Sequence, residues 1–154
     1  MKKFKHVFGF FMVVFILMLS TGCKNKKEMF IEDFKKKMES NGYYVQEATN
    51  QFSNYNYINK VYIAQSKDKT FQIEFYSMNN DESAISFYEH NKSILESNVT
   101  SSKTSVNVAN YMKFSQTSNG KYSVVSRIGK SVLYVNANDK YKTEIKKVLN
   151  ELGY

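Results

Sequence analysis

Apolar residues recur at helical spacing in three stretches of the chain. The first covers residues 28–40, the second begins at Asn80 or Asp81 and ends near Asn98, and the third covers residues 139–152. In each stretch the apolar positions fall on one face and polar residues on the other, as in a helix packed on a core. The expected inner faces are Phe30, Ile31, Phe34 and Met38 in the first helix, Ala84, Phe87, Tyr88, Asn91, Ile94 and Leu95 in the second, and Tyr141, Ile145, Val148, Leu149 and Leu152 in the third.

Between the helices, apolar and polar residues alternate, which is typical of half-buried strands. The alternation is clearest in residues 71–76, where Phe71, Ile73 and Phe75 alternate with Gln72, Glu74 and Tyr76. A polar stretch rich in Ser and Thr, residues 97–105, is expected to be a connector. The predicted strands are residues 43–48, 61–64, 71–76, 106–115, 122–128 and 132–135.

Turn and cap residues mark several boundaries. Asn119-Gly120 predicts a tight hairpin turn because Asn and Gly tolerate a positive φ at both central positions. Gly129-Lys130 predicts a second tight turn. Asp139 is expected to cap the last helix and Gly153 to end it.

These elements predict an α+β fold. Hairpins of antiparallel strands need one face covered, and amphipathic helices need a surface on which to bury their apolar stripes. We therefore expect a single antiparallel sheet of about five or six strands, packed by two or three helices. Residues 28–154 are expected to form this one domain.

The first residues of the chain have the features of an export signal. Residues 1–6 are mostly basic, residues 7–19 form an apolar run, and small residues precede Cys23. The apolar run fits the ~7–15 residues of a signal peptide and is shorter than the ~20 that cross a bilayer. We expect residues 1–22 to be a signal peptide that is cleaved between Gly22 and Cys23.

The segment Leu19-Ser20-Thr21-Gly22-Cys23 resembles the lipobox of bacterial lipoproteins, although the usual leucine stands three residues before the cysteine and this chain has Ser20 there. The resemblance implies a diacylglyceryl group with palmitate-type chains on Cys23 and a place on the extracytoplasmic face of the cell membrane, with residues 23–27 as lipidated N-terminus and linker. In size and pattern the chain is similar to small uncharacterised lipoproteins of Gram-positive, clostridia-type bacteria. The alternatives are an uncleaved membrane anchor, or ordinary cleavage that leaves a free thiol.

Charge and residue types exclude several classes of function. Lys2, Lys3 and Lys5 lie in the leader, which leaves 19 of the 22 basic residues against 14 acidic ones, too even a balance for a nucleic-acid-binding face. Cys23 is the one cysteine, and His90 is the one histidine after the leader. The set of ligands for a zinc site and a Cys–His catalytic pair are therefore lacking. We expect no nucleic-acid partner, metal, cofactor or catalytic residue.

The remaining candidates for function are tyrosines. Tyr43, Tyr44, Tyr55 and Tyr57 lie close together in the sequence, among Asn and Gln residues. Aromatic faces beside amide groups suit a glycan or a partner protein of the envelope. The alternative is that tyrosines such as Tyr43 and Tyr62 simply pack within strands and that the loop rich in Asn and Tyr reflects base composition. We expect a non-enzymatic binding or interaction module of the cell envelope. A small envelope hydrolase or lyase, and an inhibitor-type or immunity-type protein, are the alternatives.

Overall fold

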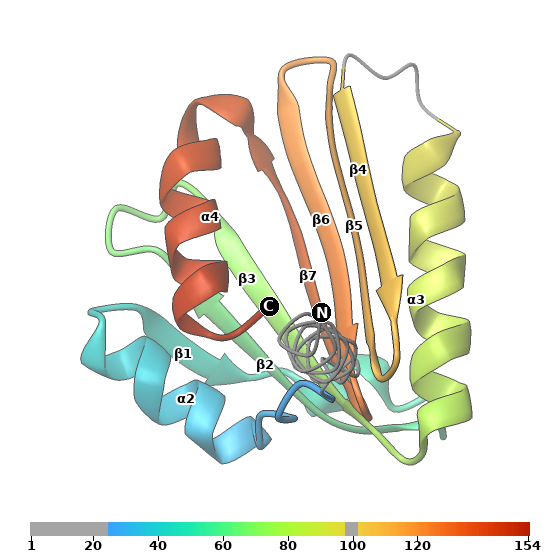
Figure 1. The fold of residues 1–154 in the computed structure, drawn as a ribbon. Helices are drawn as coiled ribbons and strands as arrows, with labels where there is room; N and C mark the ends of the chain where they lie inside the picture. Colours follow the sequence, from blue (N-terminus) through green and yellow to red (C-terminus); the bar gives the residue numbers. More distant parts are fainter. Residues whose placement is uncertain (1–24, 98–101) are drawn as a thin grey trace, which may run out of the picture.

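The computed structural model describes residues 25–97 and 102–154 (Figure 1). The predicted signal peptide, with Gly22 and Cys23, lies outside the described residues. The helices in the described residues are α2 (Ile31–Ser40), α3 (Asp81–Glu96) and α4 (Lys142–Glu151), with short 3₁₀ turns η1 (Thr49–Phe52) and η2 (Asp139–Tyr141). The strands are β1 (Tyr44–Glu47), β2 (Ile58–Gln65), β3 (Gln72–Met78), β4 (Ser102–Val108), β5 (Tyr111–Ser118), β6 (Lys121–Ile128) and β7 (Ser131–Asn138).

All seven of these strands belong to one antiparallel sheet, in the order β1-β2-β3-β7-β6-β5-β4. Each end of the chain contributes a meander, and the two meanders join where β3 pairs with β7, with Phe75 opposite Leu133. The predicted α+β class and the single antiparallel sheet are confirmed. The expected count of five or six strands was too low.

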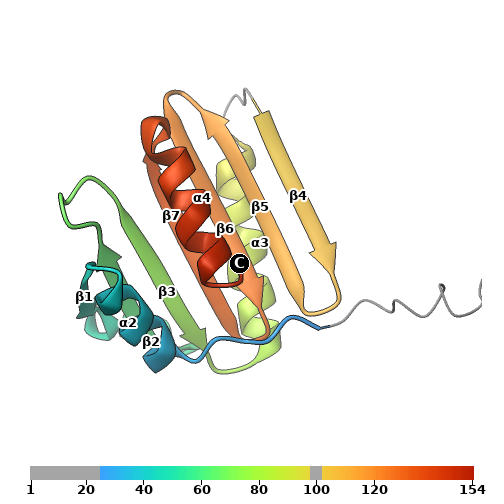
Figure 2. The same ribbon diagram turned by 60° about the vertical axis from the view of Figure 1, so that its left-hand side comes forward.

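The helices cover both faces of the sheet. Figure 2 shows α2 and α4 on one face and α3 on the other. The inner strand β6, next to the central strand β7, is accordingly buried along almost its whole length. Val124 belongs to the core beneath α4 and its neighbour Val125 to the core beneath α3. An inner strand with helices on both faces needs apolar residues at successive positions rather than at alternate ones.

On the first face, aromatic contacts fasten α2 to the sheet. Phe34 of α2 stacks on Phe75 of β3 with ring centroids 4.5 Å apart, and neither side chain is exposed. Tyr154 packs edge-on against the same Phe75 ring, and its hydroxyl is hydrogen-bonded to that of Ser131. The chain after α4 is thereby held in the core.

On the second face, α3 buries Ala84, Tyr88 and Leu95 against the sheet. Asn80 caps its start, with the side-chain Oδ1 accepting a hydrogen bond from the Ser83 N–H at 2.8 Å. Ile94, expected on the inner face, is 51% exposed. The buried stripe is narrower than predicted because α3 contacts the sheet along a single row of residues spaced by whole turns.

One predicted strand is in fact two. The stretch 106–115 turns at Ala109-Asn110 between β4 and β5, and the expected connector 97–105 already forms β4 from Ser102 onward. Ala109 has φ 50°, a conformation that its side chain does not favour. No glycine marks this turn, and residues 102–105 of this edge strand are all polar and exposed, so neither the turn nor the start of β4 could be recognised.

The other turn predictions are confirmed, and one cap is corrected. Asn119 and Gly120 both have positive φ, at 50° and 71°, in the turn between β6 and its neighbour β5. Asp139 does not cap the last helix. The Asn138 side chain accepts from the Lys140 N–H at 3.1 Å and begins η2, after which α4 follows.

Candidate functional site

The segment between η1 and β2, residues 53–57, is here called the tyrosine loop. Asn79, which follows β3, holds this loop in place with two hydrogen bonds. Its main-chain N–H donates to the Tyr57 carbonyl at 3.1 Å, and its side-chain amide donates to the Asn56 carbonyl at 2.7 Å. The loop is therefore fixed against the end of β3 that leads into α3.

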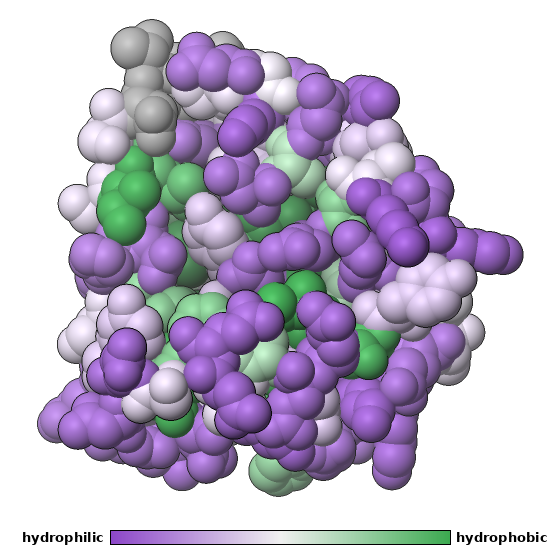
Figure 3. Space-filling model, turned by 180° about the vertical axis from the view of Figure 1, so that it is seen from behind, coloured by the Kyte–Doolittle hydropathy of each residue, from purple (hydrophilic) through white to green (hydrophobic). Residues whose placement is uncertain are grey.

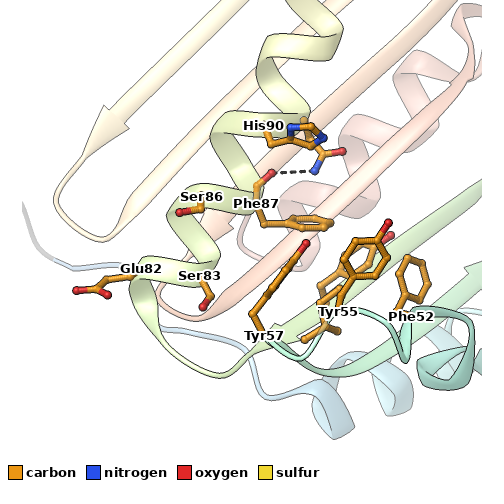
Figure 4. Close-up of a pocket in the computed structure, with 11 residues that line it drawn as sticks. Phe52, Tyr55, Tyr57, Glu82, Ser83, Ser86, Phe87 and His90 are labelled. Carbon is orange, nitrogen blue, oxygen red and sulfur yellow. Dashed lines mark hydrogen bonds between the residues drawn. The ribbon is translucent and has the colours of Figure 1, made fainter.

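A groove of about 670 Å³ lies between the tyrosine loop and α3. In Figure 4, Phe52, Tyr55 and Tyr57 stand on one side of it and Phe87 of α3 faces them. Seen from behind, apolar side chains are visible in a hollow on this face of the molecule, with polar side chains around them (Figure 3). The lining consists of Phe52, Tyr55, Tyr57, Ile58, Tyr76 and Phe87, with the polar residues Glu82, Ser83, Ser86, His90 and Asn91.

Five aromatic rings form a continuous row through this groove, here called the aromatic row. Ring centroids are 5.7 Å apart between Tyr57 and Tyr55, and 6.4 Å apart between Tyr55 and Phe52. Phe52 packs edge-on against Tyr76 at 5.4 Å, and Tyr76 lies 4.7 Å from Phe87. These spacings fall in the range of about 4.5–7 Å in which aromatic pairs attract each other. The row connects the tyrosine loop, the sheet and α3. Each ring is therefore held in position by contact with its neighbours in the row.

The polar side of the groove comes from α3. The Asn91 side-chain amide donates to the Phe87 carbonyl at 2.8 Å, which fixes its orientation (Figure 4). His90 is exposed at the rim, and the Glu82 carboxylate points away from the rings. No lysine or arginine is among the described residues that line the groove. The groove thus offers aromatic faces next to hydroxyl, amide and imidazole groups.

The phenols of Tyr57 and Tyr76 stay neutral over the physiological range. Burial raises the pKa of Tyr57, and the neighbouring Tyr55 adds to the effect. Burial also raises the pKa of Tyr76, whose hydroxyl donates to the Glu74 carboxylate. A negative charge next to a phenol disfavours the phenolate, so both causes act in the same direction.

Two kinds of feature are not found in the described residues. Across residues 25–97 and 102–154, no three His, Cys, Asp or Glu side chains gather in a way that could hold a metal ion. Within the same ranges, no helix has both the length and the apolar character needed to cross a bilayer.

The structure brings together two of the four predicted tyrosines. Tyr55 and Tyr57 line the groove, whereas Tyr43 packs edge-on against Phe71 at 6.1 Å on the α2 and α4 face. Tyr44 is 59% exposed on β1, opposite Gln65 at the far end of β2. The two pairs lie apart because β2 separates their positions by its full length. Successive residues at the start of a strand also point to opposite faces.

The sequence did not reveal the partners of the tyrosine loop. Tyr76 and Phe87 complete the aromatic row, although they lie on β3 and α3, elements distant in the sequence. The sequence predicts Phe87 on the inner face of its helix, and its partly buried side chain does pack against the core. The aromatic residues of the tyrosine loop, of β3 and of α3 are each visible in the sequence. Their contact with one another depends on the topology of the sheet, which the sequence does not show.

Comparison of the chain with models of protein families, with curated proteins and with solved structures gave no match. The function is therefore argued from the geometry of the groove.

Proposed function

We propose that the mature protein is a non-enzymatic binding module of the cell envelope, anchored on the extracytoplasmic face of the cell membrane by a diacylglyceryl group on Cys23. Its ligand is held in the groove between the tyrosine loop and α3. The observation that carries the proposal is the aromatic row, which lines an open groove, with Tyr55 and Tyr57 exposed and Tyr76 buried beneath them. Binding pockets are commonly built in this way, from aromatic walls with a few polar groups that fix the ligand's orientation.

The groove favours a neutral ligand with an apolar face, and an envelope glycan has this chemistry. A sugar ring presents C–H groups on its flat faces and hydroxyl groups at its edge. Tyr55 and Tyr57 offer rings to the faces, while Ser83 and Asn91 offer hydrogen-bonding groups to the edge. The lining described above includes no lysine or arginine that would attract an anion.

Binding accounts for the groove better than hydrolysis does. A glycosidase of the common type needs two carboxyl groups facing each other across the scissile bond, about 5–9.5 Å apart. Glu82 is the one carboxylate among the described lining residues, and it points away from the rings. His90 lies exposed on the rim of the groove.

The test is titration calorimetry of the unlipidated domain with solubilised cell-wall glycan fragments. Replacing Tyr55 and Tyr57 together by Ala removes the two exposed rings of the aromatic row on which the flat faces of a sugar would pack. We expect binding to weaken by about tenfold or more. Tyr44→Ala is the matched control because Tyr44 is as exposed as these residues but lies outside the groove.

Two results would contradict the glycan as ligand: no binding by the wild-type domain, or equal binding by the double variant. A protein ligand is the second candidate, because Tyr55 and Tyr57 are 48% and 36% exposed, and tyrosine suits protein interfaces. Pull-down of the lipidated protein from intact membranes tests it. A captured envelope protein that is lost with the double variant and retained with Tyr44→Ala would assign the groove to that protein.

A further inference from the structure

We propose that one end of the domain lies against the bilayer, with Phe30 and Val108 in contact with the lipid headgroup region. This end, here called the anchor end, consists of the segment 25–30, the β4–β5 turn, the β6–β7 turn, the β3–α3 connection and the tyrosine loop. The inference rests on the proposed lipid anchor at Cys23 and adds the orientation that this anchor imposes.

The chain is fixed to the fold immediately after the anchor site. The main-chain N–H of Lys26 donates to the Asn110 side chain at 2.9 Å, and the Asn110 amide donates back to the Lys26 carbonyl at 2.8 Å. The Lys26 ammonium group donates to the Gly153 carbonyl at 2.8 Å and lies 3.7 Å from the centre of the Tyr111 ring. Lys26 is thus tied to the β4–β5 turn and to the end of the chain.

The tether between this clamp and the lipid is short. Cys23 precedes Lys26 by three residues. An extended chain advances at most ~3.3–3.6 Å per residue, so the lipidated residue lies within about 11 Å of Lys26. Two acyl chains hold the cysteine stably at the bilayer surface. The domain therefore has little freedom to move away from the membrane or to turn its other end toward it.

The anchor end is a connected surface. Hydrogen bonds join its turns in sequence: the Gly129 N–H donates to the Asn110 carbonyl at 3.0 Å, and the Met78 N–H donates to the Lys130 carbonyl at 2.9 Å. Asn79 then holds the tyrosine loop. Figure 2 shows the segment that follows residue 24 starting near the β4–β5 turn and running along this end of the sheet, below α4, to α2.

Exposed apolar side chains gather at the anchor end. Of the seven large apolar side chains that are exposed in the described residues, four lie on or directly beside its segments: Phe30, Val108 next to the β4–β5 turn, and Tyr55 and Tyr57, which also line the groove. Phe30 is 70% exposed and Val108 is 41% exposed, and neither lines the groove. Aromatic and apolar side chains of this kind are typical of surfaces that sit at the headgroup level of a bilayer.

Charge contributes less than apolar contact. Lys27 and Lys130 can approach anionic headgroups, but Glu28 and Glu82 lie on or next to the same surface. We therefore expect the orientation to depend on the short tether and the apolar residues more than on the lipid charge. The groove opens beside the tyrosine loop, so its ligand is bound close to the membrane.

The chain has no tryptophan, so a single introduced tryptophan reports one position. The lipidated protein carrying Phe30→Trp or Val108→Trp is bound to phosphatidylcholine vesicles that contain a brominated phosphatidylcholine. We expect the brominated lipid to quench each of these at least twofold more than it quenches Ile94→Trp or Tyr44→Trp. These controls are comparably exposed, at 51% for Ile94 and 59% for Tyr44, and lie away from the anchor end.

Two outcomes overturn the inference, and they are distinguishable. Protein that sediments with the vesicles but shows equal quenching at all four positions, or the strongest quenching at Ile94→Trp, retains its anchor and lacks the proposed orientation. Protein from the native membrane fraction that does not sediment with vesicles lacks the lipid anchor, which overturns the proposed function as well.

Discussion

Two phenylalanines at the start of α2 have opposite environments. Phe34 is fully buried and stacked on Phe75, whereas Phe30 precedes the first residue of α2 and is 70% exposed. Hydrophobic periodicity placed both on the inner face of one helix. Periodicity cannot show that the helix begins at Ile31, and so it could not separate a core residue from a surface one.

Phe34→Ala is expected to lower the free energy of unfolding by about 3–5 kcal/mol, because it removes a buried ring and leaves a cavity. Phe30→Ala is expected to change it by about 0.5 kcal/mol or less. Urea unfolding of the unlipidated domain, followed by circular dichroism, measures both. Equal losses in the two variants would contradict the assigned environments.

At the scale of elements, the sequence predicted best where local signals and tertiary packing agree. Asn119-Gly120 supplies the positive φ that a two-residue hairpin needs, and the predicted turn is present. The β4–β5 turn was missed because Ala109 adopts a positive φ without any glycine to signal it. The first half of edge strand β4, residues 102–105, is polar and fully exposed, so only its end from Val106 onward was recognised as a strand.

The start of α3 gives a test at this scale. Asn80→Ala removes the side-chain acceptor of the Ser83 N–H, and we expect it to cost about 1 kcal/mol of stability. Asn80→Ser keeps an oxygen at the cap and should remain within a few tenths of a kcal/mol of the wild type. Urea midpoints of the two variants make the comparison, and an Asn80→Ser loss as large as that of Asn80→Ala would exclude the cap.

For the whole molecule, the groove is the feature that the sequence could not show. The aromatic residues of the tyrosine loop were recognisable, but their partners on β3 and α3 meet them only through the order of strands in the sheet. The same limit explains why Tyr43 and Tyr44 were grouped with Tyr55 and Tyr57. Residues that are close in the sequence can lie at opposite ends of a strand in the fold, as these two pairs do.

The buried Tyr88 predicts that the stability of the fold decreases at high pH. Burial, reinforced by Glu89 and Glu96, raises the pKa of Tyr88 to about 12, against 10.0 for the ordinary phenol. Between these values the unfolded chain has lost the proton that the folded chain retains, so stability falls as the pH rises. Tyr88→Phe should therefore lose less stability than the wild type between about pH 10 and 12. Parallel pH dependences in urea unfolding would contradict this origin.

We propose that the α+β domain is held at the outer surface of the membrane by lipid on Cys23. Mass spectrometry of the N-terminal peptide, from protein purified out of its native membranes, decides whether this lipid is present. We predict that this peptide begins at Cys23 and carries a diacylglyceryl group on the sulfur atom. A peptide that retains residues 1–22, or that begins at Cys23 with a free thiol, would contradict it.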